Sequence, residues 1–148
     1  MEMQNVKITG FIKFDLFNEK GELKQHEEIH NVIVTVGKEY LATWLTAATQ
    51  SGYFMQYLAL GTGTNAANSS QTALQTELST RVAGTLSNSS TVWQNQGTFA
   101  PGVDTGTISV AGIFSASSGG TMLARQTFAG IVKGAGDALQ VTWQVTIS

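Results

Sequence analysis

The chain has 148 residues, a net charge of −2 and no cysteine. This length suits one domain, which on folding can bury about 70% of the surface of the unfolded chain. The absence of cysteine excludes disulfides and thiol chemistry. Eight basic residues without a cluster make nucleic acid an unexpected partner. The apolar runs fall short of the roughly 18 residues of a membrane helix, and residues 1–5 lack the pattern of a signal peptide. We therefore expect no membrane partner and synthesis in the cytosol.

The composition is typical of a β-rich protein. Sixteen glycines, a single proline and many Thr, Ser, Gln and Asn residues indicate short strands that are joined by tight turns. We expect a mainly β fold over residues 1–148, an antiparallel β-sandwich or jelly-roll-like domain with one short helix packed on the sheet.

The first elements form a charged hairpin. Residues 6–16 alternate apolar and polar side chains, which predicts a half-buried strand, and residues 18–21 read as a turn. Residues 22–34 then return as the partner strand. This N-terminal hairpin, residues 1–30, is a candidate attachment element.

One helix follows the hairpin. It is expected to begin at Thr35 and to lay a single apolar stripe against the sheet, formed by Val36, Tyr40, Leu41, Trp44 and Leu45. Residues 57–60 read as a buried strand that ends at the glycines of residues 61–64. Residues 70–80 are either a short helix or an extended arm.

From residue 81 the chain alternates strands and turns. Residues 119–125 and 139–148 are predicted to form a terminal hairpin, whose last strand alternates to its final residue and is therefore built into a sheet. Aromatic residues in these strands suit a sandwich core, although exposed ones would suit a carbohydrate platform: Trp93, Phe99, Phe114, Phe128 and Trp143. Burial is the better interpretation for Trp143, which alternates with Val141 and Val145.

Charge is distributed unevenly along the chain. Twelve of the 18 charged residues lie in the first 39 positions, and residues 41–148 hold the remaining six, which are Glu77, Arg81, Asp104, Arg125, Lys133 and Asp137. Depletion of Lys, Glu and Asp is a property of protein–protein interface cores. We therefore favour an oligomer or a larger assembly over a neutral monomer coated with Thr and Ser.

Candidate metal ligands are few. His26, Glu28 and His30 share one face of a predicted strand, but the two imidazoles start roughly 13 Å apart on a straight strand, too far for one metal ion. The ordinary interpretation is a solvated hairpin face. A metal or pH-sensitive site would require copies of this strand to meet by symmetry. We predict no metal within one chain.

No catalytic or cofactor site is predicted. Residues 61–66 fit the G-x-G-x-x-A pattern of dinucleotide-binding loops, but no helix is expected after them, and a tight turn with positive φ explains both glycines. A glycosidase pair would have to come from Glu77, Asp104 and Asp137, for which turn roles are the better interpretation of the two aspartates. We expect a protein that is not an enzyme.

Several segments resemble small virion proteins of tailed bacteriophages. They are, in order, Asn31 with Gly37, residues 59–64 (ALGTGT), residues 72–77 with Arg81, residues 112–114, residues 119–128 with the sequence GGTMLARQTF, residues 133–139, and residues 142–143. The resemblance implies a virion component with a β-sandwich or jelly-roll-like body that assembles as a homo-oligomer, commonly a trimer. Proteins of this kind are described as head decoration, tail or fibre components.

The physical reading and the resemblance together predict a head decoration or cement protein, which binds the major capsid protein or other virion proteins and bridges capsid subunits. Arg81 and Arg125 are candidate interface anchors because the guanidinium group suits interface contacts. In the alternative interpretation, each arginine forms an ion pair with Glu77 or Asp137 of its own subunit and not with another protein. The alternative function is a tail fibre, tail-tip or baseplate component that binds the host surface.

Overall fold

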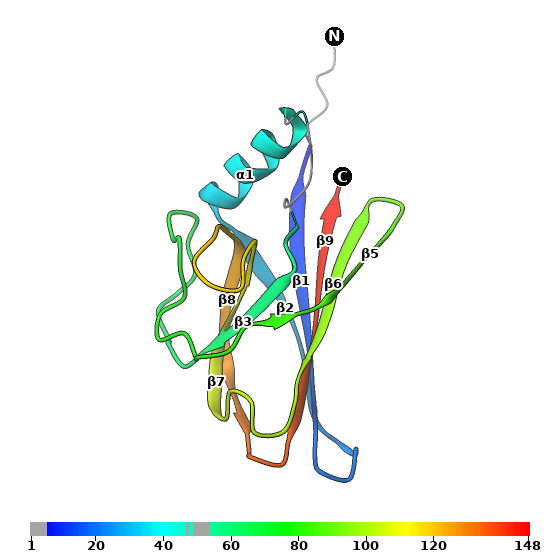
Figure 1. Ribbon diagram of the computed structural model, residues 1–148, viewed down its shortest axis with the longest axis vertical. Coiled ribbons are helices and arrows are strands. Elements are labelled where there is room, and N and C mark those ends of the chain that lie inside the picture. Colours follow the sequence, from blue (N-terminus) through cyan, green and yellow to red (C-terminus); the bar gives the residue numbers. More distant parts are fainter. Residues whose placement is uncertain (1–5, 47, 49–53) are drawn as a thin grey trace.

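The computed structural model describes residues 6–46, 48 and 54–148 and is built mainly of β-strands (Figure 1). It contains one short helix, as the sequence predicts. The elements in chain order are β1 (Ile8–Phe17), β2 (Leu23–Ile33), α1 (Thr35–Thr46), β3 (Tyr57–Gly61), β4 (Val82–Ala83), β5 (Thr85–Ser89), β6 (Val92–Phe99), β7 (Gly106–Phe114), β8 (Met122–Lys133) and β9 (Ala138–Ile147).

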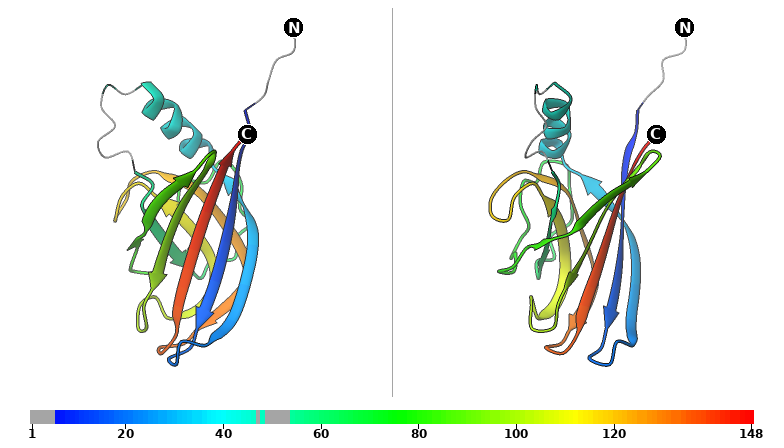
Figure 2. Two further views of the ribbon diagram at one scale, coloured as in Figure 1. Left: turned by 90° about the vertical axis from the view of Figure 1, so that its right-hand side faces the viewer. Right: turned by 45° about the vertical axis from the view of Figure 1, so that its right-hand side comes forward.

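The strands form two facing layers. Their order is β4-β3-β7-β8-β2-β1-β9-β6-β5, and each strand pairs with its neighbours in antiparallel fashion. We call β5, β6, β9, β1 and β2 the first layer, and β4, β3, β7 and β8 the second layer; they face each other in Figure 2. The antiparallel β-sandwich expected from the sequence is confirmed.

Two segments join the layers at their sides. β2 pairs with β1 along most of its length, but Val32 and Ile33 at its end pair with β8. On the opposite side, β4 pairs with β3 and β5 pairs with β6, while only Gly84 separates β4 from β5. A continuous segment therefore bridges the two layers at each side, while β5 itself remains the last strand in the order.

Alternating side chains of β1 and β9 supply much of the core. Ile12, Phe14 and Leu16 of β1 are buried between the layers, opposite the buried Leu139, Val141, Trp143 and Val145 of β9. Trp143 is 0% exposed, which confirms its predicted burial. Each large apolar side chain that is buried in this way stabilises the folded state by about 1.5–3 kcal/mol.

The N-terminal hairpin is an integral part of the first layer. β1 lies between β2 and β9, and residues 7 and 148 exchange backbone hydrogen bonds. The final strand is thus built into a sheet, as predicted. Any attachment by the hairpin would have to use its outer face or its turn, because its inner face belongs to the core.

The predicted terminal hairpin of residues 119–148 is wrong in its pairing. Both strands exist, but β8 pairs with β7 and β2 in the second layer, whereas β9 pairs with β1 and β6 in the first. Residues 134–137 carry the chain from one layer to the other. Each strand is long and amphipathic enough to be recognised, but its partner depends on contacts that are distant in sequence.

Residues 70–80 are an extended arm rather than a helix. Residues 62–81 cross the outer face of the second layer, with only an isolated bridge between Gly61 and Glu77 as regular structure in the arm. Leu74 of this arm packs on the buried Val110, Phe114 and Met122. The second layer is therefore covered on both faces.

α1 lies over one end of the sandwich (Figures 1 and 2). Gly37 sits directly on the backbone of β8, where an added Cβ would come within 2.5 Å of the Leu123 carbonyl oxygen. Tyr40 and Leu41 also pack on the core, which agrees with the predicted stripe. The last turn departs from that prediction, because Trp44 and Leu45 remain exposed.

Candidate functional site

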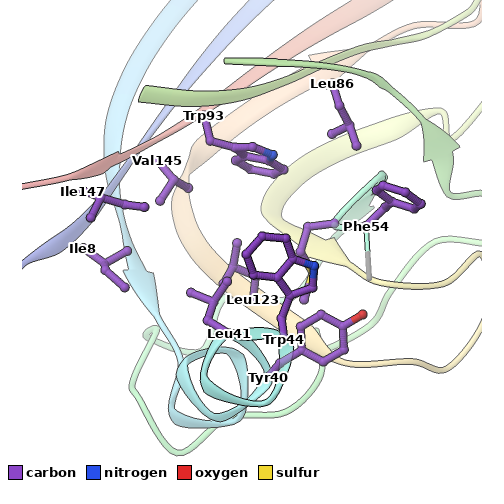
Figure 3. Close-up of a pocket in the computed structure, with 11 residues that line it drawn as sticks. Ile8, Tyr40, Leu41, Trp44, Phe54, Leu86, Trp93, Leu123, Val145 and Ile147 are labelled. Carbon is purple, nitrogen blue, oxygen red and sulfur yellow. The ribbon is translucent and has the colours of Figure 1, made fainter. Parts of the chain in front are cut away.

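An apolar cleft opens under α1, at the end of the sandwich where the two termini lie (Figure 3). Its volume is about 690 Å³. Its walls consist of Ile8, Tyr40, Leu41, Trp44, Phe54, Met55, Leu86, Trp93, Leu123, Val145 and Ile147. The volume falls within the range of about 300–1,000 Å³ that is typical of binding pockets.

Strand alternation and the helix together create this cleft. Ile8, Trp93 and Val145 continue the inner face of the first layer, as their register on β1, β6 and β9 shows. α1 provides the facing wall, from which Tyr40 and Trp44 point inwards (Figure 3). The same alternation of side chains therefore supplies both the buried core between the layers and the apolar walls of the cleft at the end of the sandwich.

The rim of the cleft is apolar and open to solvent. Phe54 is 54% exposed, Ile147 is 47% exposed, and Trp44 also contributes to the rim. In the described part of the chain, no charged side chain lines the cleft. Exposed apolar patches of this kind mark interaction sites. The cleft favours an uncharged, apolar occupant.

Buried polar atoms without partners lie in the layers of side chains beneath the cleft. The Asn31 side chain lies over Gly10, which pairs with Val145 of the cleft wall. Both polar atoms of the Asn31 amide, Oδ1 of Asn95 and Nε1 of Trp143 lack a hydrogen-bond partner among the described residues. Such groups are rare in folded proteins because each costs desolvation energy.

Arg125 holds the arm of residues 62–81 on the second layer. It is 1% exposed, and its guanidinium donates to the carbonyl and side-chain oxygens of Asn65 at 3.0 and 2.9 Å and to the Ala73 carbonyl at 3.3 Å. Burial lowers the pKa of this guanidinium. Ser109 adds a 2.8 Å hydrogen bond to the Gly63 carbonyl. The bonds of Arg125 thus lie inside the subunit, without Asp137.

Arg81 also makes its contacts within the subunit. Its Nε donates to Glu77 at 2.7 Å, Nη1 donates to the carbonyls of Ala116 and Gly119, and the guanidinium carbon lies 3.7 Å from the centre of the Phe114 ring. This is the pairing with Glu77 that the sequence left as the alternative. Several of the segments quoted for the resemblance, namely residues 72–77 with Arg81, residues 112–114 and residues 119–128, contribute to the contacts that fix the arm to the second layer.

Asp104, Lys133 and Asp137 are buried, and the exposed Lys24 forms an ion pair with Asp137. Lys24 donates to Asp137 at 2.8 Å, and this bond lowers the pKa of the carboxyl. Burial raises the pKa of Asp104 and lowers the pKa of Lys133, whose ammonium donates to the Ala100 carbonyl.

Asp104 and Asp137 both lie in connections between strands, where turns were predicted. Asp104 has φ 48° and accepts a hydrogen bond from the Thr80 amide, while Asp137 accepts one from the Gly134 amide.

The three candidate metal ligands do not converge on one point. Nδ1 of His26 lies 2.5 Å from Asp15, and its Nε2 lies 3.1 Å from Glu28, so both carboxylates raise the pKa of the imidazole. The His30 ring packs against Phe11 instead, with centroids 5.5 Å apart. Within the described residues, no group of three or more acidic, His or Cys side chains is arranged to hold a metal ion.

The explanation predicted for Gly61 and Gly63 is wrong. Neither glycine has positive φ. Both are needed for close approach, since a Cβ on Gly63 would lie 2.4 Å from the Gln75 carbonyl oxygen and one on Gly61 would lie 2.8 Å from the Thr76 carbonyl oxygen. The irregular arm follows β3, whereas a dinucleotide-binding loop is followed by a helix. This is the difference from such loops that the sequence predicts.

Comparisons with protein-family models, with curated proteins and with solved structures find no match for this chain. Among the described residues, no helix is both long and apolar enough to cross a membrane.

The sequence pattern identified the apolar stripe of α1, but the prediction assigned the whole stripe to core packing. The signal that could have identified the cleft is the concentration of large rings in that stripe, Tyr40 and Trp44.

Proposed function

We propose that this chain is a non-enzymatic structural protein of a bacteriophage virion, most specifically a head decoration protein that bridges capsid subunits. The observation that carries the proposal is the open, uncharged cleft under α1 on a sandwich whose two layers are bridged at both sides. Such a body offers one apolar end for contact with another protein. The virion assignment itself comes from the resemblance.

The position of the resembling residues supports a shared scaffold. Arg81, Arg125 and Phe114 connect the arm to the second layer, and Gly61 and Gly63 let it approach closely. These residues build a fold rather than a reactive site. A decoration protein needs only such a body, because its contribution is the interface that it buries between capsid subunits. Standard interfaces bury about 1,600 Å² in total.

Assembly as a homotrimer is part of the proposal. It is supported by the low charge of residues 41–148 and by the apolar rim residues Phe54 and Ile147. Multivalent attachment would strengthen capsid binding without further chemistry. Sedimentation equilibrium of the purified chain measures the oligomer directly; a monomer at micromolar concentration would contradict this part of the proposal.

The decisive experiment determines where in the virion this chain lies. Immunogold labelling of purified virions with antibody to this chain is expected to place gold over the heads. Gold confined to the tail would replace decoration by the alternative, a tail fibre, tail-tip or baseplate component that binds the host surface. Absence of gold from both intact and detergent-opened particles would reject the virion assignment.

A specific observation bears on the host-surface alternative. Tyr40, Trp44 and Trp93 give the cleft the aromatic faces on which sugar rings stack, but among the described residues no amide or carboxylate side chain lines it to bind sugar hydroxyls. Quenching of tryptophan fluorescence by host polysaccharide, lost in Trp44→Ala, would favour that alternative.

A further inference from the structure

β5 is the edge strand of the first layer in the described part of the chain, and it lies beside the cleft. Among the described strands it pairs with β6 and ends the strand order. Its sequence, Thr85 to Ser89, contains neither a charged residue nor proline, and most of its side chains are exposed. Natural proteins usually protect such edges with charges, proline, bulges or a covering segment, since free N–H and C=O groups attract further strands.

The edge and the cleft share one apolar surface. Leu86 of β5 and Phe54 line the cleft, and both also line a second, shallower hollow of about 420 Å³ together with Gln56, Gly84 and Thr85. At this seam the two layers are linked by a hydrogen bond from the Gly84 amide to the Gln56 carbonyl. A segment lying along β5 would therefore pass directly over the mouth of the cleft.

We propose that β5 accepts an added strand from a neighbouring protein, an extended and uncharged segment that places a large apolar side chain in the cleft. The backbone edge supplies hydrogen bonds, and the cleft selects the inward-facing side chain, as in other complexes formed by strand addition. The assignment of this segment to a neighbouring virion protein rests on the function proposed above; strand addition itself does not.

The surroundings favour a polypeptide over a small molecule. A small-molecule pocket normally encloses most of its ligand and carries a few polar groups that orient it. Here Phe54 and Ile147 stay about half exposed, and β5, whose Leu86 lines the cleft, ends the strand order. An occupant that satisfies both features has an apolar side chain and a free peptide backbone.

The test uses the isolated chain and a displayed library of random twelve-residue peptides. Selected peptides are expected to carry large apolar residues at alternating positions and few charges. Phe54→Asp and Trp44→Asp, which put a charge on the rim, are expected to weaken their binding at least tenfold. Val132→Asp is the matched control because Val132 is also apolar and exposed, at 65%, but lies outside the cleft. Circular dichroism and thermal melting verify that each variant folds.

Hydrogen exchange then identifies the mode of binding. A bound peptide is expected to slow amide exchange in residues 85–89 by at least tenfold. Failure to select any peptide, equal binding by the rim variants and the wild type, or unchanged exchange in β5 would each overturn the proposal. Binding of a small apolar dye such as ANS that a selected peptide cannot displace would also count against it.

This test is independent of the virion assignment. If peptides bind along β5 but immunogold labelling finds no virion component, strand addition stands and the proposed function fails. If labelling succeeds but β5 remains unaffected by peptides, the function stands and the partner site must lie elsewhere.

Discussion

Two apolar surfaces of this protein differ in whether its own chain covers them. The outer face of the second layer, with Val110, Phe114 and Met122, is covered by the arm of residues 62–81 and almost wholly buried. The inner face at the end of the first layer, with Ile8, Trp93 and Val145, faces an open cleft instead. Both surfaces arise from the same alternation of strand residues.

Polar side chains anchor the arm on the covered surface. The arm has little regular structure, yet Arg125, Ser109 and the side chain of Gln75 bind its backbone at several points, and Leu74 fills the space beneath it. The walls of the cleft consist of apolar and aromatic side chains, and no charged side chain lines it in the described part of the chain. The surface that is covered by its own chain thus carries specific polar residues that hold the cover, whereas we propose that the open surface binds a partner.

Removing the main anchor is expected to have the largest effect. Arg125→Ala would leave the acceptors on Asn65 and Ala73 unpaired and create a cavity, so we expect a loss of about 3 kcal/mol in the free energy of unfolding. Urea denaturation measures the loss, and Lys38→Ala, at an exposed position, serves as control. A loss below about 1 kcal/mol would show that the arm does not depend on Arg125.

A steric change under the arm should have the next largest effect. Gly63→Ala would push a methyl group against the Gln75 carbonyl, and we expect destabilisation of about 2 kcal/mol. Gly136→Ala is the matched control, since the nearest atom to its Cβ lies at an ordinary 3.5 Å. Equal melting temperatures for the two variants would contradict the close packing of the arm.

Beneath the cleft, a substitution is expected to stabilise. Asn31→Leu removes two buried polar atoms that have no partner among the described residues, so we expect a gain of about 1 kcal/mol. Asn88→Leu on the exposed part of β5 is the control and should change little. If Asn31→Leu destabilises the chain, the amide has a partner, such as a buried water molecule.

The smallest effect is expected on the exposed outer face of the first layer, away from both surfaces. Asp15 and Glu28 raise the pKa of His26, so the protonated form stabilises the fold below its ordinary pKa of about 6.5, and the contribution disappears as pH rises through the raised value. The wild type should therefore exceed His26→Gln in melting temperature by slightly more at pH 5.5 than at pH 8.5. A difference that is the same at both pH values would contradict this role of His26.

Strand positions were largely predictable, but strand partners were not. The alternation in β1 and β9 is local and strong, and it correctly predicted Trp143 as a core residue. The separation of β8 from β9 into different layers follows from contacts with β7 and β1, which no local pattern contains. The same limit applies to the arm, because its irregular backbone is defined by Arg125 at a sequence distance of 60 residues from Asn65.

The site was predictable only in its parts. The aromatic stripe of α1 was recognised, but strand and helix periodicity cannot distinguish an apolar side chain that is covered from one that is not. Trp44 and Phe54 are exposed because the first layer extends beyond the second, which is a property of the assembled sandwich. Likewise, burial of Arg125 could not be inferred from a chain in which it appeared as one of few surface charges.

The pairing of Lys7 with Ser148 has a practical consequence for labelling this protein. The amide and carbonyl of each residue bond to the other, so Lys7 and Ser148 lie side by side at the end that contains the cleft. An affinity tag or fluorescent protein fused after Ser148 would sit next to the mouth and compete with a bound partner. A label placed in the turn between β1 and β2, at the far end of the molecule, would leave that entrance clear.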